Sequence, residues 1–243
     1  MNRKSTKGGR SEDDLDPVRR AALAQDLLDA LAAHHPGSRA ELKGSLARGT
    51  ADAYSDIDIV WTVPDDHFET CATAVRGVLE AVGPLDSLRT DPELQNSRKR
   101  RLIFAAFRGL PLFWRVDLEM RASSVAHLAD YDQDNPAARG DEWSRPASAL
   151  ANAVAATKAV LRGQPVTARG LLERGFRRIG APDRLTGRWP ADIRRLAEAA
   201  ADREPGLRPL AERVVRLAGS HLAGSGEQTP RRREGRNRCT GPG

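Results

Sequence analysis

The segment that most constrains the fold runs from Asp56 to Val63 and reads DIDIVWTV. Successive side chains of a strand point to opposite faces, so Asp56 and Asp58 share one face while Ile57 and Ile59 share the other. The apolar face predicts a strand buried on one side. Two residues along a strand span roughly 6.6 Å, so the two carboxylate tips can converge on an ion lying between them.

The acidic face of this strand suits a particular ion. Mg²⁺ prefers a few carboxylate oxygens together with phosphate oxygens and water. A pair of such ions can hold both the attacking and the leaving oxygen of a phosphoryl displacement. An isolated Asp-X-Asp is also common as a solvent-facing strand edge, so the preceding segment must decide between the two interpretations.

That preceding segment begins with Gly44-Ser45, and ten residues separate Ser45 from Asp56. At a strand-to-helix turn, glycine lets the backbone approach a ligand, and a helix N-terminus offers free N–H groups to an anion. The Ser45 hydroxyl and Arg48 would add hydrogen bonds to a triphosphate. Ser55 is either another polar contact or simply the residue that starts the strand. A phosphate-binding turn followed by a carboxylate strand favours a nucleoside triphosphate with Mg²⁺.

The stretch GSLARGTADAYSDIDI resembles the signature of the nucleotidyltransferase superfamily, which has the polymerase-β-like fold. Its ARG and YSDID elements are most similar to the aminoglycoside nucleotidyltransferases and the minimal nucleotidyltransferases. The resemblance implies transfer of a nucleoside monophosphate, expected to be AMP, from an NTP such as ATP to a hydroxyl group, with release of pyrophosphate. It also implies two Mg²⁺ ions, with Asp56 and Asp58 as metal ligands.

The resemblance further implies a third carboxylate on a neighbouring strand. The run LFWRVDLEM places Asp117 and Glu119 on one face, with Val116, Leu118 and Met120 on the other. The family pattern carries the acid between two apolar residues, so Asp117 is the expected metal ligand or general base and Glu119 the reserve. An edge-strand acid without function is the alternative.

The order of elements predicts an α/β (α+β) fold, with a mixed β-sheet followed by a C-terminal helical bundle. We expect a disordered lead over 1–14, a catalytic domain over 15–135, a helical domain over 144–223 and a disordered basic tail over 224–243. A helix should start at Asp16-Pro17. Strands are expected at 101–107 and 112–120, joined by a hairpin turn at 108–111. The stretch between residues 84 and 100 reads as polar connection.

Lys158 is the only lysine of the C-terminal half. In families that resemble this chain a helical segment helps to close the nucleotide site, so Lys158 could reach the β- and γ-phosphates, or it could be a surface lysine. Trp143 would stack on a base or an acceptor, or pack at the domain junction. The carboxylates of the connector would line an acidic cleft for a cationic acceptor such as an aminoglycoside, or face solvent; they are Asp130, Asp132, Asp134, Asp141 and Glu142.

Composition narrows the setting. No apolar run approaches the ~20 residues needed to cross a bilayer, and the polar N-terminus lacks the apolar core of a signal peptide, so we expect a cytoplasmic protein without membrane contact. Cys71 and Cys239 form neither a disulfide framework nor a zinc spacing. His34-His35 reads as a helix end, not a metal site. The net charge of +6 owes much to Arg231–Arg238, which holds five arginines.

A hydroxyl-bearing small molecule is therefore the expected acceptor. Transfer to a helical protein partner, as in antitoxin-like nucleotidyltransferases, is the first alternative. Transfer to RNA is possible because of the basic tail but is not favoured, since no RNA-binding module is recognisable. A catalytically silent nucleotide-binding protein is the remaining interpretation.

Overall fold

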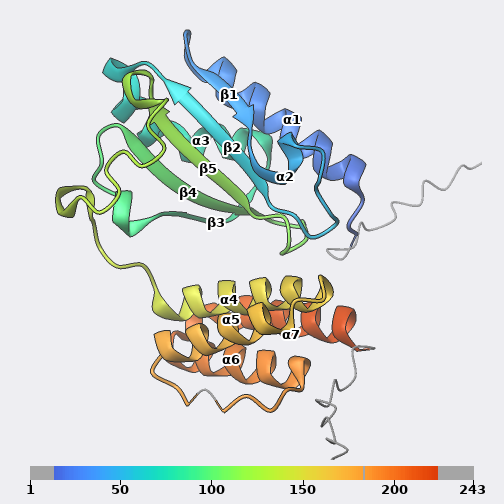
Figure 1. Ribbon diagram of the computed structural model, residues 1–243. Coiled ribbons are helices and arrows are strands. Elements are labelled where there is room, and N and C mark those ends of the chain that lie inside the picture. Colours follow the sequence, from blue (N-terminus) through green and yellow to red (C-terminus); the bar gives the residue numbers. More distant parts are fainter. Residues whose placement is uncertain (1–13, 183, 224–243) are drawn as a thin grey trace, which may run out of the picture.

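The computed structural model describes residues 14–182 and 184–223 (Figure 1). The first half forms a five-stranded sheet with helices, and the second half forms a group of helices beneath it. In the first half the elements are α1 (Pro17–His34), β1 (Arg39–Leu42), α2 (Gly44–Ala47), β2 (Ile57–Val63), α3 (Phe68–Val82), β3 (Leu85–Thr90), β4 (Arg100–Phe107) and β5 (Val116–Ala122). The second half contains α4 (Arg145–Leu161), α5 (Pro165–Arg178), α6 (Trp189–Arg203) and α7 (Arg208–Leu222).

The sheet is mixed, as expected. Its strands lie in the order β1-β2-β5-β4-β3, where β2 and β5 are parallel and every other neighbouring pair is antiparallel. The alternation expected for β2 is confirmed, because Ile57, Ile59, Trp61 and Val63 are buried while the residues between them are partly exposed. The buried face packs against α1 and α3, so the other face is left for the acidic side chains.

The start of α1 is confirmed. The Asp16 side chain accepts a hydrogen bond from the Val18 N–H at 2.9 Å, and Pro17 occupies the first turn, where its missing N–H costs nothing.

Two expectations about strands were wrong. The polar stretch Leu85–Thr90 is the edge strand β3, whose partly exposed side chains do not show the apolar alternation of a buried strand. The apolar run at 112–115 is not strand. The Trp114 N–H bonds the Pro111 carbonyl at 2.9 Å in a turn, and Phe113 and Trp114 pack against Leu217 of α7. The run is apolar because it joins the sheet to the bundle.

The hydrophobic residues gather in two main clusters, one between the sheet and α1/α3 and the other inside the α4–α7 bundle. The domain boundaries expected from the sequence stay a prediction. The segments expected as the lead and the basic tail lie almost entirely outside the described residues, and Cys239 lies outside them as well. Cys71 is buried in the first cluster. Within the described ranges, no helix combines the length and the hydropathy needed to cross a bilayer.

Candidate active site

The acidic residues gather where β2 and β5 run side by side. Asp58 and Asp117 are register partners on these parallel strands, so their side chains leave the same face of the sheet. Asp56 lies one residue before β2. Burial raises the pKa of Asp58, and the charge of Asp56 adds to the shift. Burial also raises the pKa of Asp117; Arg115 opposes this rise, and Asp56 and Asp58 add to it. The sheet therefore concentrates negative charge at one point.

Gly44 forms the wall of this acidic cluster on the β1 side. It begins α2 with φ +63°, and a Cβ at this position would lie 2.1 Å from Oδ2 of Asp58. The backbone is fixed there as well, because the Lys43 N–H donates to the Asp58 carbonyl at 2.8 Å. Only glycine fits in this close approach.

Two cations hold two of the three carboxylates. Nζ of Lys158, on α4, lies 2.6 Å from Oδ1 of Asp56. Arg115 donates to both oxygens of Asp117, at 2.5 and 2.7 Å. Burial lowers the pKa of Lys158, while Asp56 opposes that shift. Among the described residues, no hydrogen bond or ion pair reaches the carboxylate of Asp58.

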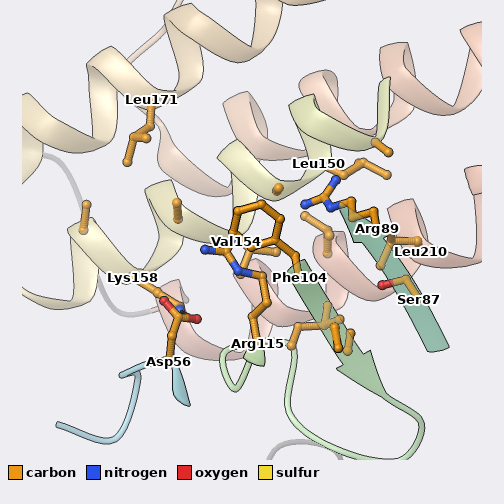
Figure 2. Close-up of a pocket in the computed structure, with 18 of the residues that line it drawn as sticks. Asp56, Ser87, Arg89, Phe104, Arg115, Leu150, Val154, Lys158, Leu171 and Leu210 are labelled. Carbon is orange, nitrogen blue, oxygen red and sulfur yellow. Dashed lines mark hydrogen bonds and ion pairs between the residues drawn. The ribbon is translucent and has the colours of Figure 1, made fainter. Parts of the chain in front are cut away.

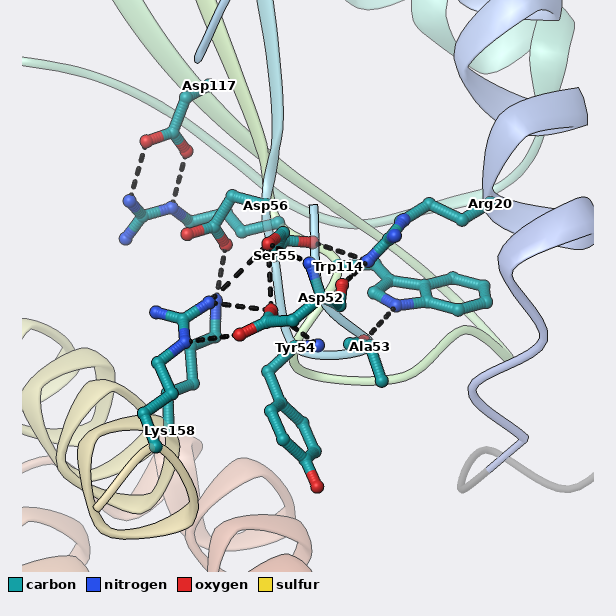
Figure 3. Close-up of polar contacts among 11 residues, drawn as sticks. Arg20, Asp52, Ala53, Tyr54, Ser55, Asp56, Trp114, Asp117 and Lys158 are labelled. Atoms are coloured by element: carbon teal, nitrogen blue, oxygen red, sulfur yellow. Dashed lines mark hydrogen bonds and ion pairs between the residues drawn. The ribbon is translucent and has the colours of Figure 1, made fainter. Parts of the chain in front are cut away.

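The loop before β2 is braced from two directions (Figure 3). Arg162, at the end of α4, donates to both carboxylate oxygens of Asp52, at 2.6 and 2.8 Å. From α1, Arg20 donates to the carbonyls of Asp52 and Ser55. The Ser55 hydroxyl is buried, donates to Asp52 at 2.8 Å and accepts from the Asp52 N–H. This loop fixes the direction in which Asp56 leaves the sheet.

The other residues expected at the nucleotide site lie at different depths. Ser45 is partly buried in α2, next to Gly44, while Arg48 is exposed at the end of that single turn. Ser55 is engaged inside its own loop. Their roles, like that of Lys158, stay predictions.

Glu119, the reserve carboxylate, is surrounded by cations. Lys43, Arg100 and Arg121 each place a nitrogen within 2.9 Å of its oxygens. Burial would raise the pKa of Glu119, but hydrogen bonds from Lys43 and Arg121 prevail and lower it. Paired in this way, Glu119 is suited to a structural ion-pair cluster, whereas Asp117 is the register partner of Asp58.

The connector does not form an acidic cleft at this site. Asp132 accepts from the Ser97 hydroxyl at 2.5 Å, Glu142 pairs with Arg145, and Asp130 and Asp134 are exposed. Trp143 packs against Phe104, with ring centroids 5.6 Å apart.

The donor set at Asp56, Asp58 and Asp117 consists of carboxylate oxygens, which fits a hard divalent cation. Within the described chain, no group of three or more His, Cys, Asp and Glu side chains is arranged to hold a metal ion. Lys158 and Arg115 are paired with two of the three carboxylates, Asp56 and Asp117. Asp58 is the one that remains open to a cation.

Sequence reasoning missed Arg115, Asp52 and Arg162. A signal existed for Arg115, because it stands two residues before Asp117 and strand alternation would place both on one face. Asp52 and Arg162 are separated by 110 residues and carry no local pattern that joins them.

Comparison with known proteins agrees with this geometry. Residues 24–108 match the family model described as nucleotidyltransferase domain. A comparison with curated proteins gives no match. Among solved structures, an aminoglycoside 6-adenyltransferase from Bacillus subtilis is similar at 13% identity and a TM-score of 0.30, over 79% of this chain and 97% of that one. Structural similarity at this TM-score supports no inference. The match to the family model is the finding that does.

The matched residues contain Gly44, Asp56 and Asp58, whereas Asp117 lies outside the match. Residues 24–108 of the chain are therefore similar to a nucleotidyltransferase domain.

Proposed function

We propose that this enzyme transfers a nucleoside monophosphate, AMP in the first instance, from an NTP to a hydroxyl group of a small molecule and releases pyrophosphate. The observation that carries the proposal is the placement of Asp58 beside Asp117 on parallel strands, with Asp56 next to them and Gly44 pressed against Asp58. Lys158 and Arg115 offset the charges of Asp56 and Asp117, so Asp58 is the partly buried carboxylate whose charge a cationic ligand would balance.

In this proposal Asp56 and Asp58 hold a divalent cation, expected to be Mg²⁺, and Asp117 adds a ligand to a second ion. Bound there, the cation would offset the charge that develops on the phosphate oxygens. Asp56 can bind the cation only after its ion pair with Lys158 is broken. Lys158 would then pair with the β- and γ-phosphates.

The transfer itself is a single displacement. The acceptor oxygen forms a bond to the α-phosphorus, and the bond from that phosphorus to the bridging oxygen of pyrophosphate breaks. As the alternative to ligating a second ion, Asp117 would take the proton from the acceptor hydroxyl, because burial raises its pKa and makes it a better base than a solvated carboxylate. Arg115 holds the Asp117 carboxylate in position through its two hydrogen bonds.

The two substrates would approach the carboxylates from opposite sides. Gly44 and Ser45 follow β1, so the triphosphate lies on the β1 side of Asp58, within reach of Arg48. The acceptor then enters from the β5 side, between the sheet and the bundle. This arrangement brings the α-phosphate and the acceptor hydroxyl together at the carboxylates.

The proposal is tested by a transfer assay with α-labelled ATP, GTP, CTP and UTP in the presence of Mg²⁺. The acceptors are aminoglycosides, lincosamides, RNA and a cell lysate separated into small molecules and proteins. We expect label in the small-molecule fraction, lost on chelation and in the variants Asp56→Ala and Asp58→Ala. Label on one lysate protein or on RNA would replace the small-molecule acceptor with those alternatives. Absence of transfer, with ATP binding unaffected by both variants, would identify a silent nucleotide-binding protein.

A further inference from the structure

A cavity of about 370 Å³ lies between the sheet and the bundle, and Asp56 is the site carboxylate that lines it (Figure 2). Asp56 and Lys158 lie at one end, and Ser87 and Arg89 lie at the other. Phe104 lies between the two ends. A molecule in this cavity would therefore touch the reacting region with one end only.

Strand register explains why the cavity has two distinct ends. Asp58 pairs with Asp117, Asp117 with Phe104, and Phe104 with Arg89, so these side chains form one row across β2, β5, β4 and β3. With neighbouring strands about 4.8 Å apart, Arg89 lies about 14 Å from Asp58 and about 10 Å from Asp117 along the sheet. The row thus sets the length of a molecule that spans it.

The charges that line the cavity are mostly positive. Its basic side chains are Arg89, Arg115, Lys158 and Arg162, and its one acidic side chain is Asp56. Three of these cations are already paired with carboxylates, since Lys158 bonds Asp56, Arg115 bonds Asp117 and Arg162 bonds Asp52.

Arg89 is the exception. In the described part of the chain, no hydrogen bond or ion pair reaches its guanidinium group. It lies instead on aromatic rings, 4.7 Å from the centroid of Trp143 and 5.8 Å from that of Phe104. Burial lowers the pKa of Arg89, and the neighbouring Arg115 adds to that shift. A half-buried guanidinium without an anion is a binding position for one.

The walls between the two ends are apolar. One side is the Phe104 ring, with the Arg115 guanidinium 4.8 Å from its centroid, and the facing side consists of aliphatic residues of α4, α5 and α7. They include Leu150, Val154, Leu171, Leu210 and Val214. This surface suits a flat hydrocarbon body and offers nothing to a molecule covered with ammonium groups.

We propose that the acceptor is an anionic, amphipathic small molecule: its hydroxyl lies at the carboxylates, its flat apolar body lies along Phe104, and its acidic group binds Arg89. The proposal rests on the proposed nucleotidyl transfer and identifies the class of its second substrate. A polycation such as an aminoglycoside would meet the like charge of Arg89, which no carboxylate balances in the described part of the chain, and is disfavoured.

The test measures binding by calorimetry without nucleotide, so that it does not depend on catalysis. The probe is 6-hydroxy-2-naphthoic acid, which carries its hydroxyl and carboxylate at opposite ends of a flat body. Its neutral counterpart is 2-naphthol, and kanamycin serves as the polycation. We expect the wild type to bind the acid roughly tenfold or more tightly than 2-naphthol, because of the charge-assisted hydrogen bonds to Arg89.

Three variants locate the interaction. Arg89→Gln should remove the preference for the acid while leaving 2-naphthol binding unchanged. Ala151→Phe, which fills the cavity from α4, should weaken both probes. Arg76→Gln, on the distant helix α3, is the control and should change neither. Ala151→Phe also provides a test should Arg89→Gln fail to fold.

The inference is overturned if 2-naphthol or kanamycin binds more tightly than the acid, if the preference for the acid persists in Arg89→Gln, or if Ala151→Phe weakens the binding of neither probe. Failure of the proposed function looks different. In that case the acid binds with the expected dependence on Arg89, yet no labelled nucleotide reaches any hydroxyl-bearing acid.

Discussion

At the scale of single residues, Gly44 shows how the signature turn and the carboxylates depend on each other. Two features exclude other residues at this position: the positive φ, and the 2.1 Å that would separate a Cβ from Oδ2 of Asp58. The glycine of the motif therefore has a steric role that can be stated without any ligand, since it leaves the space that the Asp58 carboxylate occupies.

Gly49 provides a matched control for this steric role. It has a similar φ of +68°, but a Cβ there would meet nothing within 4 Å. We expect Gly49→Ala to lose about 1 kcal/mol of stability through backbone strain and to keep its activity. Gly44→Ala should lose the same stability and, in addition, roughly 100-fold or more of its transfer rate, because Asp58 must move. Thermal unfolding and the transfer assay separate the two effects, and equal activity in both variants would contradict the steric role.

At the scale of elements, the sequence predicted those parts whose chemistry is local. The cap at Asp16, the alternation in β2 and the glycine turn each depend on neighbouring residues, and each is found where expected. The edge strand β3 escaped prediction because its exposed side chains leave no alternation. The run at 112–115 misled because burial against α7 and burial in a strand produce the same apolar sequence.

In the candidate site, too, the residues that belong to local sequence patterns were predicted and those joined by long-range contacts were not. Asp56, Asp58 and Asp117 follow from alternation and from the family pattern, and the sheet brings them together. The pairing of Asp52 with Arg162 and the row that ends at Arg89 depend on strand order and on the position of α4, and neither is encoded within a short segment.

Helix α5 offers a test of packing within the bundle. A Cβ on Gly175 would lie 2.6 Å from Cδ2 of Leu196 on α6, whereas one on Gly170 would meet nothing within 4 Å. Because alanine is the better helix former, we expect Gly170→Ala to stabilise the protein by up to about 1 kcal/mol. Gly175→Ala should destabilise it by about 1–2 kcal/mol, since overpacking outweighs the same gain. Chemical denaturation measures both, and stabilisation by Gly175→Ala would show that α5 and α6 are not packed this closely.

At the scale of the whole molecule, the sheet and the bundle are joined by charged contacts that meet at the site. Asp52 and Asp56 come from the loop before β2, and Lys158 and Arg162 come from α4 and its C-cap. The same helix lines the cavity, so the position of α4 determines both the neutralisation of the carboxylates and the space for the acceptor.

This junction should make stability depend on pH. Hydrogen bonds from Arg162 lower the pKa of Asp52 well below its ordinary value of 3.8. A lowered carboxylate pKa contributes stability above the unfolded-state value and loses it as the pH falls below that value. We expect Asp52→Asn to be less stable than wild type at pH 7 by about 1 kcal/mol or less, because the pair is partly exposed to solvent.

The difference in the free energy of unfolding between Asp52→Asn and wild type should shrink as the pH falls from 5 toward 2. Denaturant unfolding at each pH measures this difference. Glu142→Gln, which breaks an exposed pair with Arg145, serves as the control and should change stability by a few tenths of a kcal/mol at most. A difference that grows on acidification would contradict the assigned Asp52–Arg162 interaction.

The central claim is that Asp58 belongs to a nucleotidyl-transfer site and not to the structural framework. The most direct measurement compares wild type, Asp58→Asn and Asp66→Asn for release of pyrophosphate and transfer of label from α-labelled NTP into the lysate small-molecule fraction. Asp66 is exposed on the sheet side of the molecule and controls for the loss of one carboxylate. We expect Asp58→Asn to fold with a melting temperature at least equal to that of the wild type, because burial raises the pKa of Asp58 and makes its ionised form costly. The variant should lose roughly 100-fold or more of its transfer rate, while Asp66→Asn keeps it. Transfer by Asp58→Asn at the wild-type rate, or its failure to fold, would contradict the account.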